Sequence, residues 1–178
     1  MKAPSTQKKP APPLNNRRLR DIALHYVGRY ATTKAKLSTY LNRKIRERGW
    51  QEGEAYADLD AMMQDFAELG YVNDAAYADA RARSFVRKGY GARRLEQDLH
   101  AAGISDFDAS GARAETSSST FASADAFARR KRIGPYSSEP APPERRQKQL
   151  QAFLRAGHSF DLARRFVQAD PGSEVNEE

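Results

Sequence analysis

Cysteine is absent from this sequence of 178 residues, and no apolar run approaches the length that crosses a bilayer. Without cysteine the chain can form neither disulfides nor thiolate metal sites, which fits a reducing cytoplasm. The first residues are rich in lysine, proline and alanine, and they lack the apolar core of a signal peptide. These absences predict a cytoplasmic protein without a membrane partner.

The sequence also lacks the motifs that accompany catalysis. It contains no Walker loop, no dinucleotide-binding glycine pattern, no nucleophile elbow and no H-E-x-x-H. His25, His100 and His158 lie far apart along the chain, where surface or helix-cap roles are expected. Because no pattern assembles a nucleophile, a base and an orienting group, we predict a protein that is not an enzyme. We also expect neither a cofactor nor a metal ion.

Acidic residues are too few to balance the basic ones. The chain has 30 lysines and arginines against 23 acidic residues, a net charge of +7. Removing the ends, with five basic residues in 1–18 and four acidic residues in 170–178, leaves 25 basic and 19 acidic residues. A basic body points to nucleic acid or another polyanionic partner. A merely soluble basic protein would have the same composition.

Apolar residues recur at intervals of three and four, the spacing of an amphipathic helix, and no segment reads as a strand. The spacing predicts eight or nine helices, among them helices over 19–30, 54–69, 121–133 and 144–156. A leucine pair four residues apart with a glycine after it recurs at Leu37–Leu41, Leu95–Leu99 and Leu150–Leu154. Repeats of this length are typical of arrays of small helical units that pack on their neighbours.

The repeats suggest boundaries along the chain. We expect a disordered basic tail over 1–18, three-helix repeats over 19–72, 73–120 and 121–170, and an acidic tail over 171–178. The basic tail would either contact phosphate or serve as an inert solubilising segment. The serine-rich residues 105–120 predict a short or irregular third helix in the second repeat, with a linker as the alternative.

Two basic clusters are the candidate binding residues. Six basic side chains and no acidic one lie between positions 81 and 94, and four more follow in one run. The candidates are Arg81, Arg83, Arg87, Lys88, Arg93, Arg94, Arg129, Arg130, Lys131 and Arg132. Any single one could be an ordinary solvated surface residue. Six like charges within fourteen residues repel one another, however, and the cluster therefore predicts a surface for a protein partner or DNA.

Four segments together resemble the RecX family, the small bacterial regulators of the RecA recombinase. They are G-Y-V-N-D-A-A-Y-A (70–78), K-G-Y-G-A-R-R-L-x3-L-x3-G-I (88–104), A-R-R-K-R-I-G-P (128–135) and L-R-A-G-H-S-F-D-L-A-R-R (154–165). The resemblance extends over roughly 19–169. It implies an all-α fold of tandem three-helix repeats in an elongated, curved array.

The resemblance also implies a function. A RecX-type protein binds as a monomer along the groove of the RecA filament on single-stranded DNA. There it modulates, usually inhibits, strand exchange and ATP hydrolysis in DNA repair, recombination and the SOS response. One alternative is an independent DNA-binding protein that uses the basic helix pair around Gly89–Gly91. A base-reading helix would more naturally present Asn, Gln or Ser beside Arg. A second alternative is a helical scaffold for acidic proteins.

Overall fold

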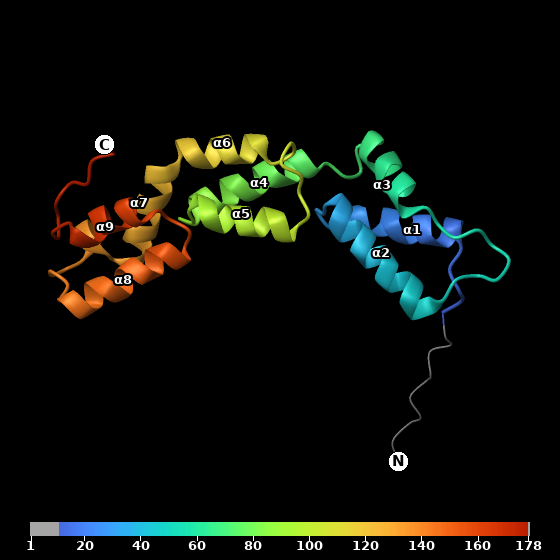
Figure 1. Cartoon of the computed structure of the whole chain (residues 1–178), viewed down its shortest axis with the longest axis horizontal. Helices are drawn as coiled ribbons and strands as arrows, with labels where there is room; N and C mark the ends of the chain where they lie inside the picture. The colour runs from blue at the N-terminus through green and yellow to red at the C-terminus, as the bar shows by residue number, and fades with distance from the viewer. Residues whose placement is uncertain (1–10, 178) are drawn as a thin grey trace, which may run out of the picture. The chain divides into compact units, whose positions relative to one another are not determined.

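The computed structural model describes residues 11–177, and this part of the chain is all-α (Figure 1). Its α-helices are α1 (Asn16–Val27), α2 (Lys34–Arg48), α3 (Leu59–Glu68), α4 (Asp74–Arg87), α5 (Ala92–Ala101), α6 (Ser110–Ser118), α7 (Thr120–Lys131), α8 (Pro143–Arg155) and α9 (Phe160–Gln168). A 3₁₀ turn, η1 (Gly134–Tyr136), follows α7. The predicted fold class of helical repeats is confirmed. None of the helices between residues 11 and 177 has the length and apolar character of a membrane span.

The chain divides after Asn73 into two compact units. In the first unit, α1, α2 and α3 share one core, whose fully buried members include Leu19, Leu37, Leu41 and Phe66. Each helix starts at a side-chain cap: Asn15 accepts from the Arg18 amide, Thr33 from Lys36 and Asp58 from Ala61. Such caps satisfy amides at a helix start that have no partner within the helix.

Two predicted boundaries in this unit were wrong. The third helix begins at Leu59 rather than Glu54, because Asp58 caps it and Trp50 holds the preceding loop. The Trp50 indole N–H donates to the Glu54 carbonyl at 3.2 Å, and its ring stacks on Tyr56. Apolar residues spaced three and four apart predict that a helix is present, but they do not show where the loop before it ends.

The predicted tail over 1–18 extended too far along the chain. Its first ten residues lie outside the described residues, but Leu14 is fully buried in the core and α1 begins at Asn16. The Leu14 amide donates to the Gly49 carbonyl at 2.9 Å, and its carbonyl accepts from Gln51 at 2.7 Å. A single buried leucine among prolines and asparagines has no periodicity, so the sequence pattern missed it.

The second unit contains two cores. One is formed by α4, α5 and α6 around Phe85, Leu95 and Leu99, and the other by α7, α8 and α9 around Phe153 and Phe166. The residues after α9 contact the latter core, since Val175 packs against it and the Gly172 amide donates to the Pro135 carbonyl at 3.0 Å. Three consecutive helices thus share each core of the described chain.

The serine-rich segment forms a regular helix, so the linker alternative is wrong for residues 110–118. Figure 1 shows α6 lying along α4. The contact depends on small buried residues, which are Ala78 and Ala82 on α4, Ala112 on α6 and Ala109 just before α6. Small side chains let two helices pack closely without the large apolar stripe that a sequence pattern detects. Arg113 also anchors α6 by donating to Glu96 at 2.8 and 3.0 Å.

Candidate partner-binding surface

Five of the six basic residues of the first cluster are exposed. Arg83 and Arg87 lie one turn apart on α4, Lys88 follows the helix, and Arg93 and Arg94 occupy the first turn of α5. None of these side chains forms an ion pair with any residue between 11 and 177. Cations in a first helical turn oppose the helix dipole, so Arg93 and Arg94 do not stabilise α5 electrostatically.

Arg81 differs from the other five, and its assignment to a binding surface is not supported by its contacts. Its guanidinium donates two hydrogen bonds of 2.7 Å to the two carboxylate oxygens of Asp98 on α5. It also lies 4.9 Å from the Phe85 ring centroid. The hydrogen bonds to Asp98 raise the pKa of Arg81. This bidentate pair connects α4 to α5, and Asp98 offsets one charge of the cluster from outside the 81–94 window.

The two types of arginine should differ in their effect on stability. Replacing Arg81 by alanine leaves the half-buried Asp98 without its partner and should lower the free energy of unfolding by about 1–2 kcal/mol. The control Arg83→Ala removes an exposed side chain of the same helix and should stay within about 0.5 kcal/mol. Urea unfolding followed by circular dichroism measures both. Equal free energies of unfolding for the two variants would restore Arg81 as a candidate binding residue.

The second basic cluster lies at the end of α7, and its four members have different surroundings. Arg129 pairs with Asp125 at 3.3 Å and donates to the Tyr136 hydroxyl at 3.2 Å, while that hydroxyl donates to Asp125. Lys131 and Arg132 are exposed, and Arg132 adopts a left-handed conformation with φ of 53° as α7 ends. Both are without an ion pair in the described chain.

Arg130 brings the two clusters together. Its guanidinium donates to the Lys88 carbonyl and lies near the rings of Tyr90 and Phe127, at 5.6 and 5.4 Å from their centroids. Arg87 and Lys88 at the end of α4 therefore adjoin the end of α7. The sequence separates these segments by about forty residues and gave no sign that they meet.

A second connection joins the α4–α5 turn to the α8–α9 loop. The Gly91 amide donates to the Ala156 carbonyl at 2.9 Å, and the Arg93 amide donates to the Gly157 carbonyl at 3.2 Å. His158 Nε2 lies 3.1 Å from the Gly89 carbonyl, to which it donates. We call Gly89, Gly91, Gly157 and His158 the inter-repeat joint, because they link the α4–α6 core to the α7–α9 core.

His158 was predicted to lie at the surface or to cap a helix, and this prediction was wrong. The ring is buried against Phe127 and Phe153, with centroid separations of 5.6 and 5.3 Å. Burial lowers the pKa of His158, so the neutral ring is favoured. Its Nδ1 is buried without a hydrogen-bond partner among the described residues, so no acceptor there stabilises a second proton, in agreement with a neutral ring protonated on Nε2. The A-G-H sequence at 156–158 was the available signal, since glycine beside a polar residue marks close backbone approach.

Comparisons with known proteins agree on one family. A family model described as RecX, second three-helix domain, matches residues 73–112. The chain is 33% identical over 161 residues to Regulatory protein RecX of Myxococcus xanthus, covering 86% of each chain. It is 31% identical over 147 residues to Regulatory protein RecX of Agrobacterium fabrum, covering 80% of this chain and 78% of the relative. The crystal structure of RecX from Lactobacillus salivarius superposes with a TM-score of 0.59 at 20% identity, over 85% of this chain and 94% of that one. This structural match concerns the fold alone.

Proposed function

Because this chain belongs to the RecX family of regulatory proteins, we propose that it binds the RecA–DNA filament and inhibits strand exchange and ATP hydrolysis. Its relatives are named as regulatory proteins rather than enzymes, and we propose a regulatory role here as well. The partners are RecA and the single-stranded DNA within the filament. The protein acts as a monomer built from three repeats, which comprise α1–α3, α4–α6 and α7–α9.

One observation supports this function above the others. Arg87, Lys88, Arg93 and Arg94 are exposed cations without a carboxylate partner in the described chain. The inter-repeat joint and the Arg130–Lys88 contact hold them beside the end of α7. Cations that no intramolecular carboxylate neutralises are available to phosphate or to an acidic protein surface.

The filament proposal predicts a preference among partners. The protein should bind RecA-coated single-stranded DNA roughly tenfold or more tightly than bare DNA or RecA alone, because contacts to both components add through one scaffold. Cosedimentation with filaments assembled on a non-hydrolysable ATP analogue measures the first affinity. Fluorescence anisotropy with labelled oligonucleotide measures the second.

The same preparation tests the direction of regulation. RecA ATP hydrolysis on single-stranded DNA should fall as the protein is added and recover as salt weakens the ionic contacts. A rise in ATP hydrolysis would contradict inhibition. Equal affinity for bare DNA and for filaments would favour the alternative, an independent DNA-binding protein.

A further inference from the structure

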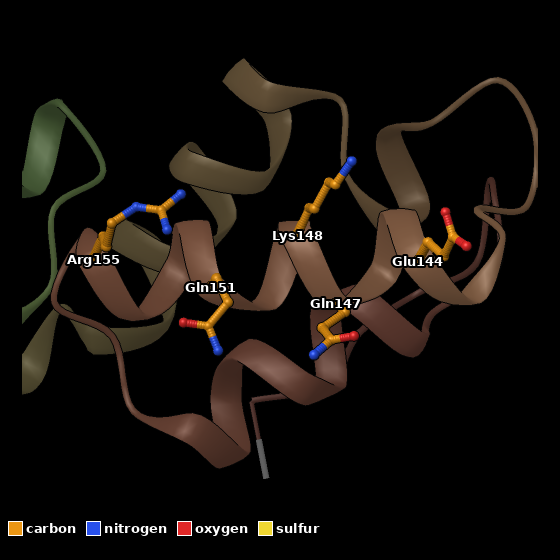
Figure 2. A pocket seen from close by; sticks show the side chains of 5 residues that line it. All are labelled: Glu144, Gln147, Lys148, Gln151 and Arg155. Carbon is orange, nitrogen blue, oxygen red and sulfur yellow. The ribbon is translucent and has the colours of Figure 1, made fainter.

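The outward face of α8 presents a row of polar side chains. Exposed residues recur along it at the three- and four-residue spacing of one helix face, while Phe153 on the opposite side is fully buried. They line a shallow concavity of about 440 Å³. Its lining residues are Glu144, Gln147, Lys148, Gln151 and Arg155 (Figure 2).

This face divides into two parallel rows. Figure 2 shows Lys148 and Arg155 directed to one side of α8 and Gln147 and Gln151 to the other. None of these four side chains has a hydrogen-bond or ion-pair partner between residues 11 and 177. Intramolecular contacts therefore do not account for this polar row, and its groups are available to a partner.

The pairing of amides with cations fits DNA better than an acidic protein surface. Lys148 and Arg155 are seven residues apart, about 10 Å along the helix axis, so each can reach a different phosphate of one strand. A glutamine amide both donates and accepts, which suits sugar oxygens and base edges. A surface of carboxylates offers only acceptors and would leave the glutamine carbonyls without a donor, whereas base edges offer both donors and acceptors.

The α8 face also continues the surface described above. Arg155 is the last residue of α8, and the next residue, Ala156, accepts a hydrogen bond from Gly91 in the inter-repeat joint. Arg93 and Arg94 lie two and three residues after Gly91, in the first turn of α5. The joint therefore places the end of the α8 row beside the exposed arginines of α5.

We propose that the outward face of α8 is a binding surface for single-stranded DNA that continues from Arg93 and Arg94. Lys148 and Arg155 contact backbone phosphates, and Gln147 and Gln151 hydrogen-bond to sugars or base edges. An α8 surface for DNA extends the proposed function, and its biological role rests on that function. Binding to bare DNA can nevertheless be measured without RecA.

The decisive experiment compares two double variants of the full chain by anisotropy, on a labelled single strand and on the matching duplex. Lys148→Ala with Arg155→Ala should weaken binding to the single strand by roughly tenfold near 0.1 M salt, and should reduce the salt slope by about 1 to 2. The control, Arg17→Ala with Arg29→Ala, removes two exposed charges from the first unit. It should change affinity by only about twofold through net charge. A loss of affinity confined to the duplex would contradict the proposal.

The glutamines supply an independent test. Gln147→Ala with Gln151→Ala should weaken binding while leaving the salt slope unchanged, because no charge is lost. The proposal is overturned if the wild-type protein does not bind bare DNA, or if the α8 cation variant matches the control. It is also overturned if that variant keeps its DNA affinity but loses its effect on RecA, which would assign α8 to a protein contact. If wild type leaves RecA activity unchanged while DNA binding still depends on α8, the regulatory proposal fails and this one stands.

Discussion

Replacing Gly157 by alanine should lower the free energy of unfolding of the unit after Asn73 by roughly 3 kcal/mol. Gly157 has a φ of 95°, in the region that side chains disfavour. A Cβ there would lie 2.4 Å from the Arg94 amide nitrogen and 2.7 Å from its Cβ. The backbone of α5 cannot move away without breaking the Arg93–Gly157 hydrogen bond. The energetic cost of the positive φ and the cost of the steric overlap with Arg94 therefore add.

A matched glycine separates these two costs. Gly172 has a φ of 75°, also in the left-handed region, but no atom of residues 11–177 lies within 4 Å of its added Cβ, so Gly172→Ala should cost only about 1 kcal/mol. Gly91→Ala provides the converse, because its φ of −84° is ordinary while its Cβ would lie 2.4 Å from Gly157. Calorimetry or urea unfolding of the three variants measures the differences. Equal losses for Gly157→Ala and Gly172→Ala would show that the joint is not closely packed in solution.

The sequence predicted the helices well where one stripe of large apolar residues faces a core. Leu37, Leu41 and Ile45 are such a stripe, and all three are buried on α2. The fold class follows from this kind of local periodicity. The same rule failed at α6, where the buried face consists of Ala112 and Thr116. Alanine and threonine do not form a stripe of large apolar side chains, so apolar periodicity did not separate a helix from a linker here, and the packing on α4 decides between them.

The candidate surface was predictable in composition and not in arrangement. A count of charges over 81–94 identified the exposed arginines but could not separate Arg81, whose partner Asp98 lies on the next helix. The Arg130–Lys88 contact and the His158–Gly89 hydrogen bond join segments 42 and 69 residues apart. These contacts depend on how the repeats pack against each other, and no local pattern in the sequence indicates that packing. The α8 row was not predicted from the sequence, because its two cations, Lys148 and Arg155, are seven residues apart and do not form a basic run.

The triple replacement Arg87→Ala, Arg93→Ala and Arg94→Ala should abolish most of the protein's effect on RecA-driven strand exchange. Affinity for DNA should fall by roughly tenfold or more at 0.1 M salt, with a salt slope smaller by about 2 to 3. The fold should be nearly unaffected, because these side chains are exposed and without ion-pair partners in the described chain. Alanine keeps the Arg94 Cβ that packs at Gly157, and it removes two cations from a helix start where they oppose the dipole.

Net charge is the competing explanation, and a second triple variant controls for it. Arg17, Arg29 and Arg46 are exposed residues of the first unit, and their joint replacement by alanine removes the same three charges. Strand-exchange assays and matched melting curves should show a large loss of function for the first variant and a small one for the second. Equal losses would mean that overall charge, rather than the surface at the inter-repeat joint, attracts the partner. A stable first variant with wild-type activity would instead indicate a site at Lys131 and Arg132, the exposed residues at the end of α7 that form no ion pair within residues 11–177.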